Sequence, residues 1–273
     1  MMLPDIQKVI AIIENTAKQY ICPRFQNLSP SEVHVKTSGD LVSIADIEAE
    51  KYLKKKLSEL VPNSYIVGEE EVEYFPENLK YLQSTDPVWI LDPLDGTRNF
   101  INGKKPFTII IAFCVGKKTQ MGCIHDPITN ETVWAVKGQG CWSGQKCIKL
   151  DKFSSFEYMK GYLSKYQTTN NKVLDNLSLS IRRVGSIGRE YLDLALGNIQ
   201  FASFDTTLKP WDHAAGVLIH TESGGYNRLG KSDNIYHPKL KFNQTKTSND
   251  TLILAPNKKT FNAIYSVLQK KES

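Results

Sequence analysis

Two aspartates that follow an apolar run are the residues of this sequence best suited to chemistry. Residues 88–91 are apolar and predict a buried strand, and Asp92 and Asp95 come directly after it. Pro93 lies between them and cannot donate the hydrogen bond that a sheet needs, so we predict that the strand ends at Asp92. Both carboxylates can then face one point.

A turn suited to binding an anion follows these acids. The backbone N–H groups of Gly96 and Thr97 can lie at a helix start, where phosphate binds. Two carboxylates beside an anion would repel it unless a cation lies between them. Oxygen ligands without a nearby His or Cys cluster favour Mg²⁺ or Mn²⁺. The alternative is that Asp92 and Asp95 only cap a turn, as in most such strings.

Two other stretches add carboxylates. Three adjacent acids, Glu69 to Glu71, follow the apolar residues 65–67, and at a sheet edge they would repel one another without a cation. Asp212 opens a predicted helix rich in small residues (213–216), which lets backbone approach closely. A simple helix N-cap is the competing interpretation of Asp212.

Hydrophobic periodicity predicts the elements that must position these acids. The first half contains two amphipathic helices and three strands, followed by an antiparallel meander of three short strand-like stretches between 116 and 150. The helices are expected between Pro4 and Pro23 and over 44–60, and the strands over 65–67, 88–91 and 107–115. In the second half strands and helices alternate. These strands are expected near 161–164, 199–204 and 252–254, and these helices over 186–196, 211–223 and 256–269. We place a soft boundary near Leu150, between halves 1–150 and 151–273.

Composition excludes several classes of protein. With 273 residues, 41% of them hydrophobic and 23% charged, the chain is neither disordered nor fibrous and can bury a large core. Its net charge of +5 is spread over scattered lysines, so a nucleic-acid-binding stripe is not expected. The longest apolar run, 107–115, is far shorter than the roughly 18 residues of a membrane span.

Other residue types point to an ordinary cytoplasmic protein. Asp5 and Lys8 interrupt the apolar stretch that a signal peptide needs, so we expect the chain to stay in the cytoplasm. The five cysteines include no Cys-x-x-Cys pair, so we expect reduced, structural thiols and no thiolate zinc site. We interpret His213 and His220 as structural, because a lone helical histidine is rarely a ligand.

Taken together, the acidic stretches resemble the inositol monophosphatase family of metal-dependent, lithium-sensitive sugar phosphatases. The three motifs that carry the resemblance stand in the family's order: Gly68-Glu69-Glu70, Asp92-Pro93-Leu94-Asp95-Gly96-Thr97 and Trp211-Asp212-His213-Ala214-Ala215-Gly216. The similarity extends to residues 36–46 and, loosely, to 138–142 and 183–186, so it covers nearly the whole chain, and only 151–180 and 227–249 contain no residues that anchor it. It implies an α/β (α+β) fold, a layered αβαβα sandwich.

The resemblance also implies Mg²⁺-dependent hydrolysis of a phosphomonoester with two or three ions, Mn²⁺ being an alternative. Glu69, Asp92 and the carbonyl of Leu94 would hold the first ion. Asp92, Asp95 and Asp212 would hold the second. The first ion would acidify the attacking water, and the second would stabilise the leaving alkoxide.

Further roles come from the same resemblance. Thr97, supported by Asp46, would orient the water, so these two residues join Glu69 and Glu70 as catalytic candidates. Glu70 would lie behind the first ion or help to hold a third one, and Lys36 would balance the acids. The expected substrate contacts are Asp92, Asp95, Gly96, Thr97, Asp205 and Asp212.

The residue that selects the substrate stays open between two positions. Inositol-type members have an acid six residues before the Trp-Asp motif that contacts sugar hydroxyls, and Asp205 occupies that offset. Counted from Gly197, the strand is one residue longer than usual, and Phe204 takes the equivalent position. Asp205 is then a solvated acid at a strand end.

The leading hypothesis is therefore a cytoplasmic phosphatase for inositol phosphate or a related sugar or polyol phosphate, expected as a homodimer. The alternatives among enzymes are a 3′(2′),5′-bisphosphate nucleotidase, a fructose-1,6-bisphosphatase and a histidinol-phosphatase. Asn99-Phe100 after the middle motif favours the inositol type over the nucleotidases. From another class, the chain could be a non-catalytic regulator that binds RNA or protein, although every acid that the chemistry requires is present.

Overall fold

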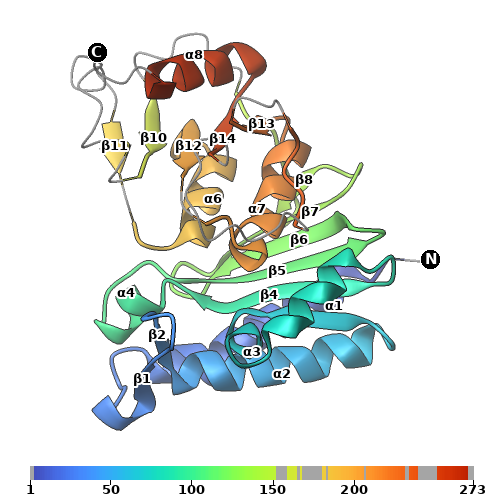
Figure 1. Cartoon of the computed structure of the whole chain (residues 1–273), viewed down its shortest axis with the longest axis vertical. Coiled ribbons are helices and arrows are strands. Elements are labelled where there is room, and N and C mark those ends of the chain that lie inside the picture. The colour runs from blue at the N-terminus through green and yellow to red at the C-terminus, as the bar shows by residue number, and fades with distance from the viewer. Residues whose placement is uncertain are drawn as a thin grey trace.

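Helices and sheets alternate in layers through the molecule. The computed structural model describes residues 3–151, 159–164, 167, 180–182, 184–205, 207–230, 234–238 and 251–269. Figure 1 shows α1 (Ile6–Thr16) and α2 (Ile44–Leu60) against one face of a seven-stranded sheet. Helices α6 (Ile187–Ala195) and α7 (Pro210–Glu222) separate it from a five-stranded sheet, which α8 (Lys258–Gln269) covers. The αβαβα sandwich is confirmed.

The predicted first helices are present and have clear start signals. The Asp5 side chain accepts a hydrogen bond from the Gln7 N–H at the start of α1 (2.9 Å). At α2, Ser43 and Asp46 form a reciprocal capping box. Beyond α1 a π-helical segment extends over Ala17–Ile21. The apolar faces of both helices share a core cluster with side chains of the large sheet, such as Trp89.

The large sheet has the order β3-β4-β5-β6-β7-β8-β9. Its strands are β3 (Tyr65–Gly68), β4 (Val88–Asp95), β5 (Thr108–Val115), β6 (Lys118–Asp126), β7 (Glu131–Val136), β8 (Cys141–Ser143) and β9 (Lys146–Ile148). Only the β3–β4 pair is parallel. The meander after residue 116 has four strands where three were predicted. Asp126 explains the extra turn, since its carboxylate accepts from the N–H groups of Ile128 and Thr129 (2.8 and 3.1 Å).

The prediction that the strand ends at Asp92 is wrong. Strand β4 continues through Pro93 to Asp95, and its pairing with β5 shifts register between the two aspartates. Pro93 is tolerated because the irregularity falls at its position, and the Asp92 carboxylate accepts from the Leu94 N–H (2.9 Å). The irregularity changes the alternation of side chains, so both acids line the same cavity.

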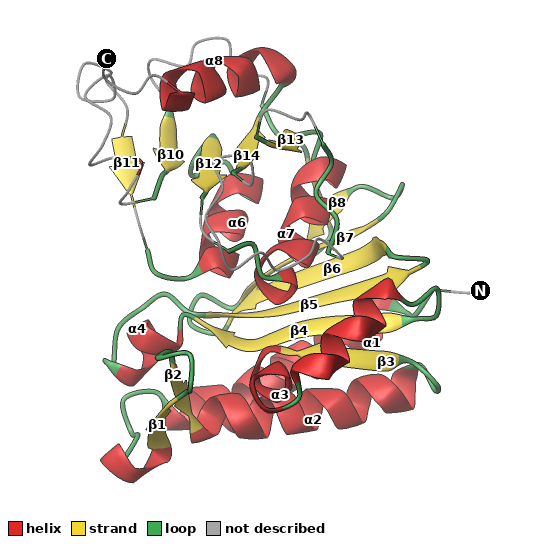
Figure 2. Cartoon of the chain, viewed as in Figure 1, coloured by secondary structure: helices red, strands yellow, loops and turns green. Residues whose placement is uncertain are grey.

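The second half contains the predicted strands and helices, together with two strands that were not predicted (Figure 2). The small sheet has the order β11-β10-β12-β14-β13. Its strands are β10 (Lys160–Tyr162), β11 (Ser180–Arg182), β12 (Phe201–Phe204), β13 (Tyr226–Leu229) and β14 (Leu252–Ala255). Much of 151–180 lies outside the described residues. The division near Leu150 stays a prediction, and one core cluster contains residues from both sides of it, such as Ile110 and Leu192.

Helix α7 packs very closely on the large sheet. A Cβ atom at Gly122 of β6 would lie 2.8 Å from the Ala215 carbonyl oxygen of α7, so the glycine is needed for this contact. Gly216 of α7 makes room on another side, because a Cβ atom there would lie 2.2 Å from the ring of Tyr191 on α6. This packing brings Asp212, in the first turn of α7, over the end of β4.

Several short elements escaped the sequence analysis. They include the ribbon of β1 (Val33–Val35) and β2 (Leu41–Ser43), α3 (Glu69–Tyr74), a 3₁₀ helix over Pro76–Gln83, α4 (Thr97–Ile101), and the strands β11 and β13. In the part of the chain that the structure describes, no helix is both long and apolar enough to span a bilayer. All five cysteines are free thiols.

Both histidines of α7 are buried, and His220 allows a test of how much a buried histidine lowers the stability of the protein at acidic pH. Burial lowers the pKa of His220 to about 3, and the Asn227 amide donates to its Nδ1 atom (3.2 Å). The folded protein therefore keeps His220 neutral, while the unfolded chain takes up a proton below about pH 6.5. The contribution of neutral His220 to the free energy of unfolding is therefore complete above about pH 6.5, and it is lost as the pH falls from 6.5 toward 3.

We expect His220→Gln to remove this dependence. The free energy of unfolding, measured by urea titration at pH 7 and pH 5, should fall by about 2 kcal/mol less in the variant than in the wild type. An equal fall in both proteins would show that His220 does not titrate in this way.

Candidate active site

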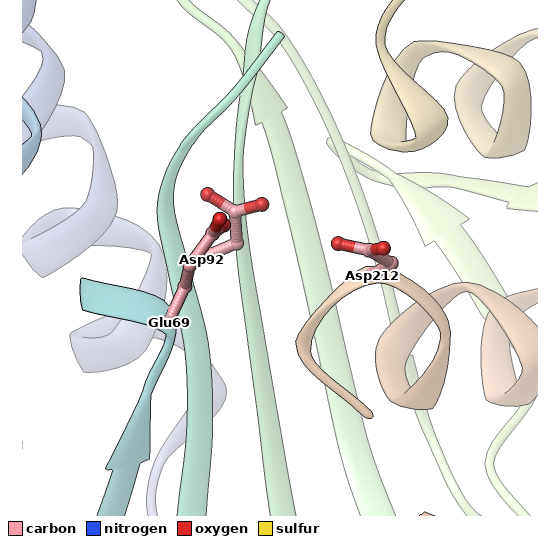
Figure 3. Close-up of side chains that lie close together, drawn as sticks. All are labelled: Glu69, Asp92 and Asp212. Atoms are coloured by element: carbon pink, nitrogen blue, oxygen red, sulfur yellow. The ribbon is translucent and has the colours of Figure 1, made fainter. Parts of the chain in front are cut away.

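Three carboxylates from different elements converge at one end of the large sheet. Glu69 is the first residue of α3, Asp92 lies on β4 and Asp212 lies in the first turn of α7. Each offers one oxygen, and these oxygens all lie within 4.8 Å of one another. Figure 3 shows Glu69 and Asp92 next to each other, with Asp212 facing them across a gap. The structure thus brings together one acid from each of the three motifs.

Burial and repulsion by neighbouring acids make Asp92 and Asp212 costly to ionise. Burial raises the pKa of Asp92 well above its usual range, and the negative charges of Glu69, Asp95 and Asp212 raise it further. Asp212 responds in the same way, because burial and the charges of Glu69 and Asp95 raise its pKa. A cation between the acids would reverse both effects, since it favours the ionised form of each.

Asp95 lies beside the other acids but is held by α6. The Ser186 hydroxyl, the Gly188 N–H and the Thr108 hydroxyl donate to its Oδ2 atom at 2.5, 2.7 and 3.0 Å. The Ile187 N–H donates to Oδ1 at 3.1 Å. Burial raises the pKa of Asp95, and these hydrogen bonds act against the rise. The start of α6 therefore fixes the orientation of this carboxylate.

The donor set fits a hard divalent cation. All its side-chain members are carboxylates, and the Leu94 carbonyl adds a neutral oxygen on the wall of the same cavity. Oxygen-only sets of this kind suit Mg²⁺ or Mn²⁺ better than Zn²⁺ or Cu²⁺. Repulsion among buried acids gives the physical reason for a cation here.

Lys36 supplies a positive charge next to two of the acids, Glu69 and Glu70. Its Nζ atom lies 3.0 Å from Glu69 Oε1 and 2.8 Å from Glu70 Oε1, and its side chain is only 5% exposed. Burial alone would lower the pKa of Lys36, but the charges of Glu69 and Glu70 raise it above its ordinary value. The ammonium group is therefore charged and balances two acids, as the sequence analysis expected.

Thr97 links the Leu94 carbonyl to a buried aspartate, Asp46. Its Oγ1 atom lies 2.9 Å from Asp46 Oδ1 and 2.9 Å from the Leu94 carbonyl oxygen. Asp46 Oδ2 accepts from both the N–H and the hydroxyl of Ser43 (2.8 and 2.6 Å). Burial raises the pKa of Asp46 to about 6. The same carboxylate thus caps α2 and contacts Thr97.

The acids line a small open cavity of about 210 Å³. Its walls include every predicted metal ligand and both residues of the turn: Glu69, Asp92, Leu94, Asp95, Gly96, Thr97 and Asp212. Gly96 has a φ of 94°, which favours glycine, and a Cβ atom there would lie 3.1 Å from the Pro106 carbonyl oxygen. Asp46 and Glu70 lie behind this wall, both buried.

Two basic residues of the cavity were missed by the sequence analysis. Arg98 and Lys209 both line it. The Lys209 Nζ atom lies 3.6 Å from Asp40 Oδ2, and the charges of Glu69 and Asp212 raise its pKa against the effect of burial. The sequence gives one weak indication of each residue. Arg98 directly follows Thr97, and Lys209 directly precedes the helix that carries Asp212.

Neither candidate for substrate selection lines this cavity among the described residues. Phe204 is buried in the core, where it stacks on Tyr191 with ring centroids 5.6 Å apart. Asp205 is half-buried, and its Oδ2 atom accepts from the Ser164 hydroxyl (2.6 Å). A pocket role for Phe204 would require it to leave the core, so Asp205 is the candidate that the structure leaves accessible.

Comparison with known proteins places the chain in a family. The model of the inositol monophosphatase family matches residues 5–272, and the chain belongs to this metal-dependent family. A fructose-1,6-bisphosphatase/inositol-1-monophosphatase of Thermotoga maritima is 29% identical over 188 residues, 68% of this chain and 70% of the relative. A protein named Nus factor SuhB, from Vibrio cholerae serotype O1, is 30% identical over 217 residues, 76% of this chain and 79% of the relative.

A solved structure agrees with the fold. An IMPase of Thermotoga maritima superposes with a TM-score of 0.79 at 22% identity, covering 96% of each chain. The resemblance inferred from three acidic motifs is therefore confirmed for the family and for the fold.

Proposed function

We propose that the chain is a Mg²⁺-dependent phosphomonoesterase that acts on inositol monophosphate or a related sugar or polyol phosphate. The observation that carries this proposal is the convergence of Glu69, Asp92 and Asp212 beside Thr97. Family membership and the relative named for both fructose-1,6-bisphosphate and inositol-1-phosphate support it.

Two overlapping sets of ligands would hold the cations. Glu69, Asp92 and the Leu94 carbonyl form one set, and Asp92, Asp95 and Asp212 form the other. Asp92 belongs to both sets because it lies between the elements that carry the remaining ligands. Bound Mg²⁺ supplies acidity to a water molecule and positive charge to the phosphate oxygens.

Thr97 and Asp46 would orient the attacking water. The Thr97 hydroxyl has a single hydrogen, yet it lies at 2.9 Å from two acceptors, Asp46 Oδ1 and the Leu94 carbonyl. When it donates to Asp46, the Leu94 carbonyl is free to bind a cation. The Oγ1 lone pairs can then accept a hydrogen from the water. Asp46 thus sets the direction of the Thr97 hydroxyl.

A phosphate-release panel tests the proposed function. The purified chain is assayed with Mg²⁺, Mn²⁺ or EDTA on inositol 1-phosphate, fructose 1,6-bisphosphate, histidinol phosphate, adenosine 3′,5′-bisphosphate and an aryl phosphate. We expect cation-dependent release, with the highest kcat/KM on a polyol or sugar phosphate, and inhibition by Li⁺. A preference for the nucleotide would select the bisphosphate nucleotidase, and no release from any monoester would contradict the proposal.

A regulatory role is the second candidate, and the relative named as a Nus factor favours it. Such a role would use a surface for RNA or protein and would not need the carboxylate cavity. The oligomeric state bears on this role, because the interface of the expected homodimer would reduce the surface left for RNA or protein partners. Light scattering of the purified chain measures its oligomeric state.

Asp205 provides the test of substrate selection. If its carboxylate accepts hydrogen bonds from vicinal hydroxyls, Asp205→Ala should lower kcat/KM for the sugar or inositol phosphate about tenfold or more. An aryl phosphate lacks those hydroxyls, so its hydrolysis should stay nearly unchanged. Equal losses on both substrates would assign Asp205 a structural role through its bond to Ser164. No loss on either would remove it from recognition.

A further inference from the structure

Glu50 is a buried acid to which neither the motifs nor the proposed function gives a role. It lies on α2, is only 4% exposed and faces the start of α3. Its Oε2 atom accepts from the Glu70 N–H (2.9 Å), and its Oε1 atom accepts from the Glu71 N–H (2.8 Å). Both donors directly follow Glu69, the predicted ligand.

Helix α3 depends on a cap from outside. It has six residues, and of these only Glu70 and Val72 are buried. A helix this short gains little from its own hydrogen bonds, and its first N–H groups need acceptors. Its N-cap residue is Gly68, which has no side chain to accept them. The carboxylate of Glu50, which lies on the long helix α2, accepts these hydrogen bonds instead.

The glycine before α3, Gly68, is explained by the same contact with Glu50. A Cβ atom at Gly68 would lie 2.4 Å from Glu50 Cδ and 2.5 Å from Glu50 Oε2, too close for any other residue without movement. The φ of Gly68 is −100°, which every residue type adopts. Space for the Glu50 carboxylate, and not backbone conformation, is therefore the reason for glycine here.

We propose that Glu50 is a positioning residue that fixes the start of α3 so that the Glu69 carboxylate faces Asp92 and Asp212. This inference rests on the proposed cation site. Groups that orient a metal ligand without touching the metal commonly change metal affinity 10- to 100-fold when they are mutated.

The charge of Glu50 is a competing explanation for a change in cation affinity, and the test must separate it from the effect of Glu50 on the position of α3. Burial raises the pKa of Glu50 to about 7, so above that pH Glu50 adds a negative charge near Glu69, and its removal could weaken cation binding even if α3 did not move. Glu50→Gln removes both the charge and one acceptor. Glu50→Asp keeps the charge but shortens the side chain, and Gly68→Ala keeps the charge but displaces the carboxylate.

Glu222 provides a matched control. Its two carboxylate oxygens accept from the N–H groups of Gly138 and Gly140 (2.9 and 3.0 Å), the same kind of contact at a turn that does not line the cavity. Glu222→Gln should lower the melting temperature without changing cation affinity.

The experiment is a titration of the full chain with Mn²⁺, followed by electron paramagnetic resonance, without substrate. We expect Glu50→Gln, and at least one of Glu50→Asp and Gly68→Ala, to weaken the tightest Mn²⁺ site about tenfold or more relative to wild type. Glu222→Gln should bind as the wild type does.

Three results would overturn the inference. The first is wild-type affinity in Glu50→Gln together with a lower melting temperature, which would leave Glu50 a purely structural cap. The second is a loss in Glu50→Gln alone, with both charge-keeping variants unaffected, which would assign the effect to charge. The third is a wild-type chain that binds no Mn²⁺, which would remove the cation site itself and the proposed function with it.

Discussion

Asp92→Asn should abolish cation binding and lower phosphate release at least ~10³-fold. Asp92 is the one carboxylate shared by both proposed ligand sets, and it lies between Glu69 and Asp212 (Figure 3). An amide supplies neither the charge nor the second donor oxygen that two cations would need. The loss of Lewis-acid assistance is worth several kcal/mol, which corresponds to this change in rate.

Thermal unfolding gives an internal control for this variant. A ligand that binds only the folded state raises its melting temperature. The wild type should therefore melt higher in Mg²⁺ than in EDTA, whereas Asp92→Asn should melt at the same temperature in both. A variant that keeps the Mg²⁺-induced rise would show that Asp92 is not a shared ligand.

The same variant should not destabilise the cation-free protein. Burial and neighbouring acids raise the pKa of Asp92 in the folded state, so folding disfavours its ionised form and costs free energy at any pH above the unfolded-state pKa of about 4. The wild type is then penalised at neutral and high pH, and the penalty disappears as the pH falls below about 4, where Asp92 becomes neutral in both states. In EDTA, Asp92→Asn should be at least as stable as the wild type at pH 8, with a smaller advantage at pH 5.

The acids of the site were predictable because each follows a strong local signal. Asp92 and Glu69 come after apolar runs that form β4 and β3, and Asp212 comes at the start of a helix. Parallel pairing of β3 and β4 brings the first two acids to one edge of the sheet. Apolar runs and helix starts are local properties, so composition and spacing carry them.

Contacts across the chain were not predictable from spacing. Glu50 meets the start of α3 only because α2 packs beside it, and no pattern near residue 50 marks a cap for residue 70. The contact of Lys209 with Asp40 likewise joins α7 to the β1–β2 ribbon. These pairs depend on tertiary packing, which periodicity does not encode.

The irregularity in β4 shows a limit of a different kind. Proline predicts a strand end because it lacks an N–H, but it is also tolerated where strand pairing shifts register. The sequence around Pro93 is compatible with both outcomes. The strand continues past Pro93 because β4 pairs with β5 again beyond the register shift, where Asp95 lies opposite Thr108. As a result Asp95 reaches the start of α6, where Ser186 and Gly188 bind it.

Thr97→Ala should lower kcat about 100-fold or more while leaving KM close to that of the wild type. The hydroxyl is proposed to orient the attacking water, and a well-placed proton acceptor contributes about 10² to 10⁴ in rate. Phosphate binding should survive, because the backbone amides of Gly96 and Thr97 and the carboxylates that hold the cations remain. The cost in stability is about 1 kcal/mol, since the hydroxyl has a single hydrogen and donates to either Asp46 or the Leu94 carbonyl at one time.

Two variants separate the hydroxyl from the shape of the side chain. Thr97→Ser keeps the hydroxyl and should retain most of the turnover, whereas Thr97→Val keeps the shape and should behave as Thr97→Ala does. Steady-state kinetics with a sugar phosphate and with an aryl phosphate should show the same loss of kcat, because the water attacks phosphorus in both. A defect confined to KM would mean that Thr97 binds the ground state. Normal turnover in Thr97→Val would show that the Thr97 hydroxyl does not orient the water.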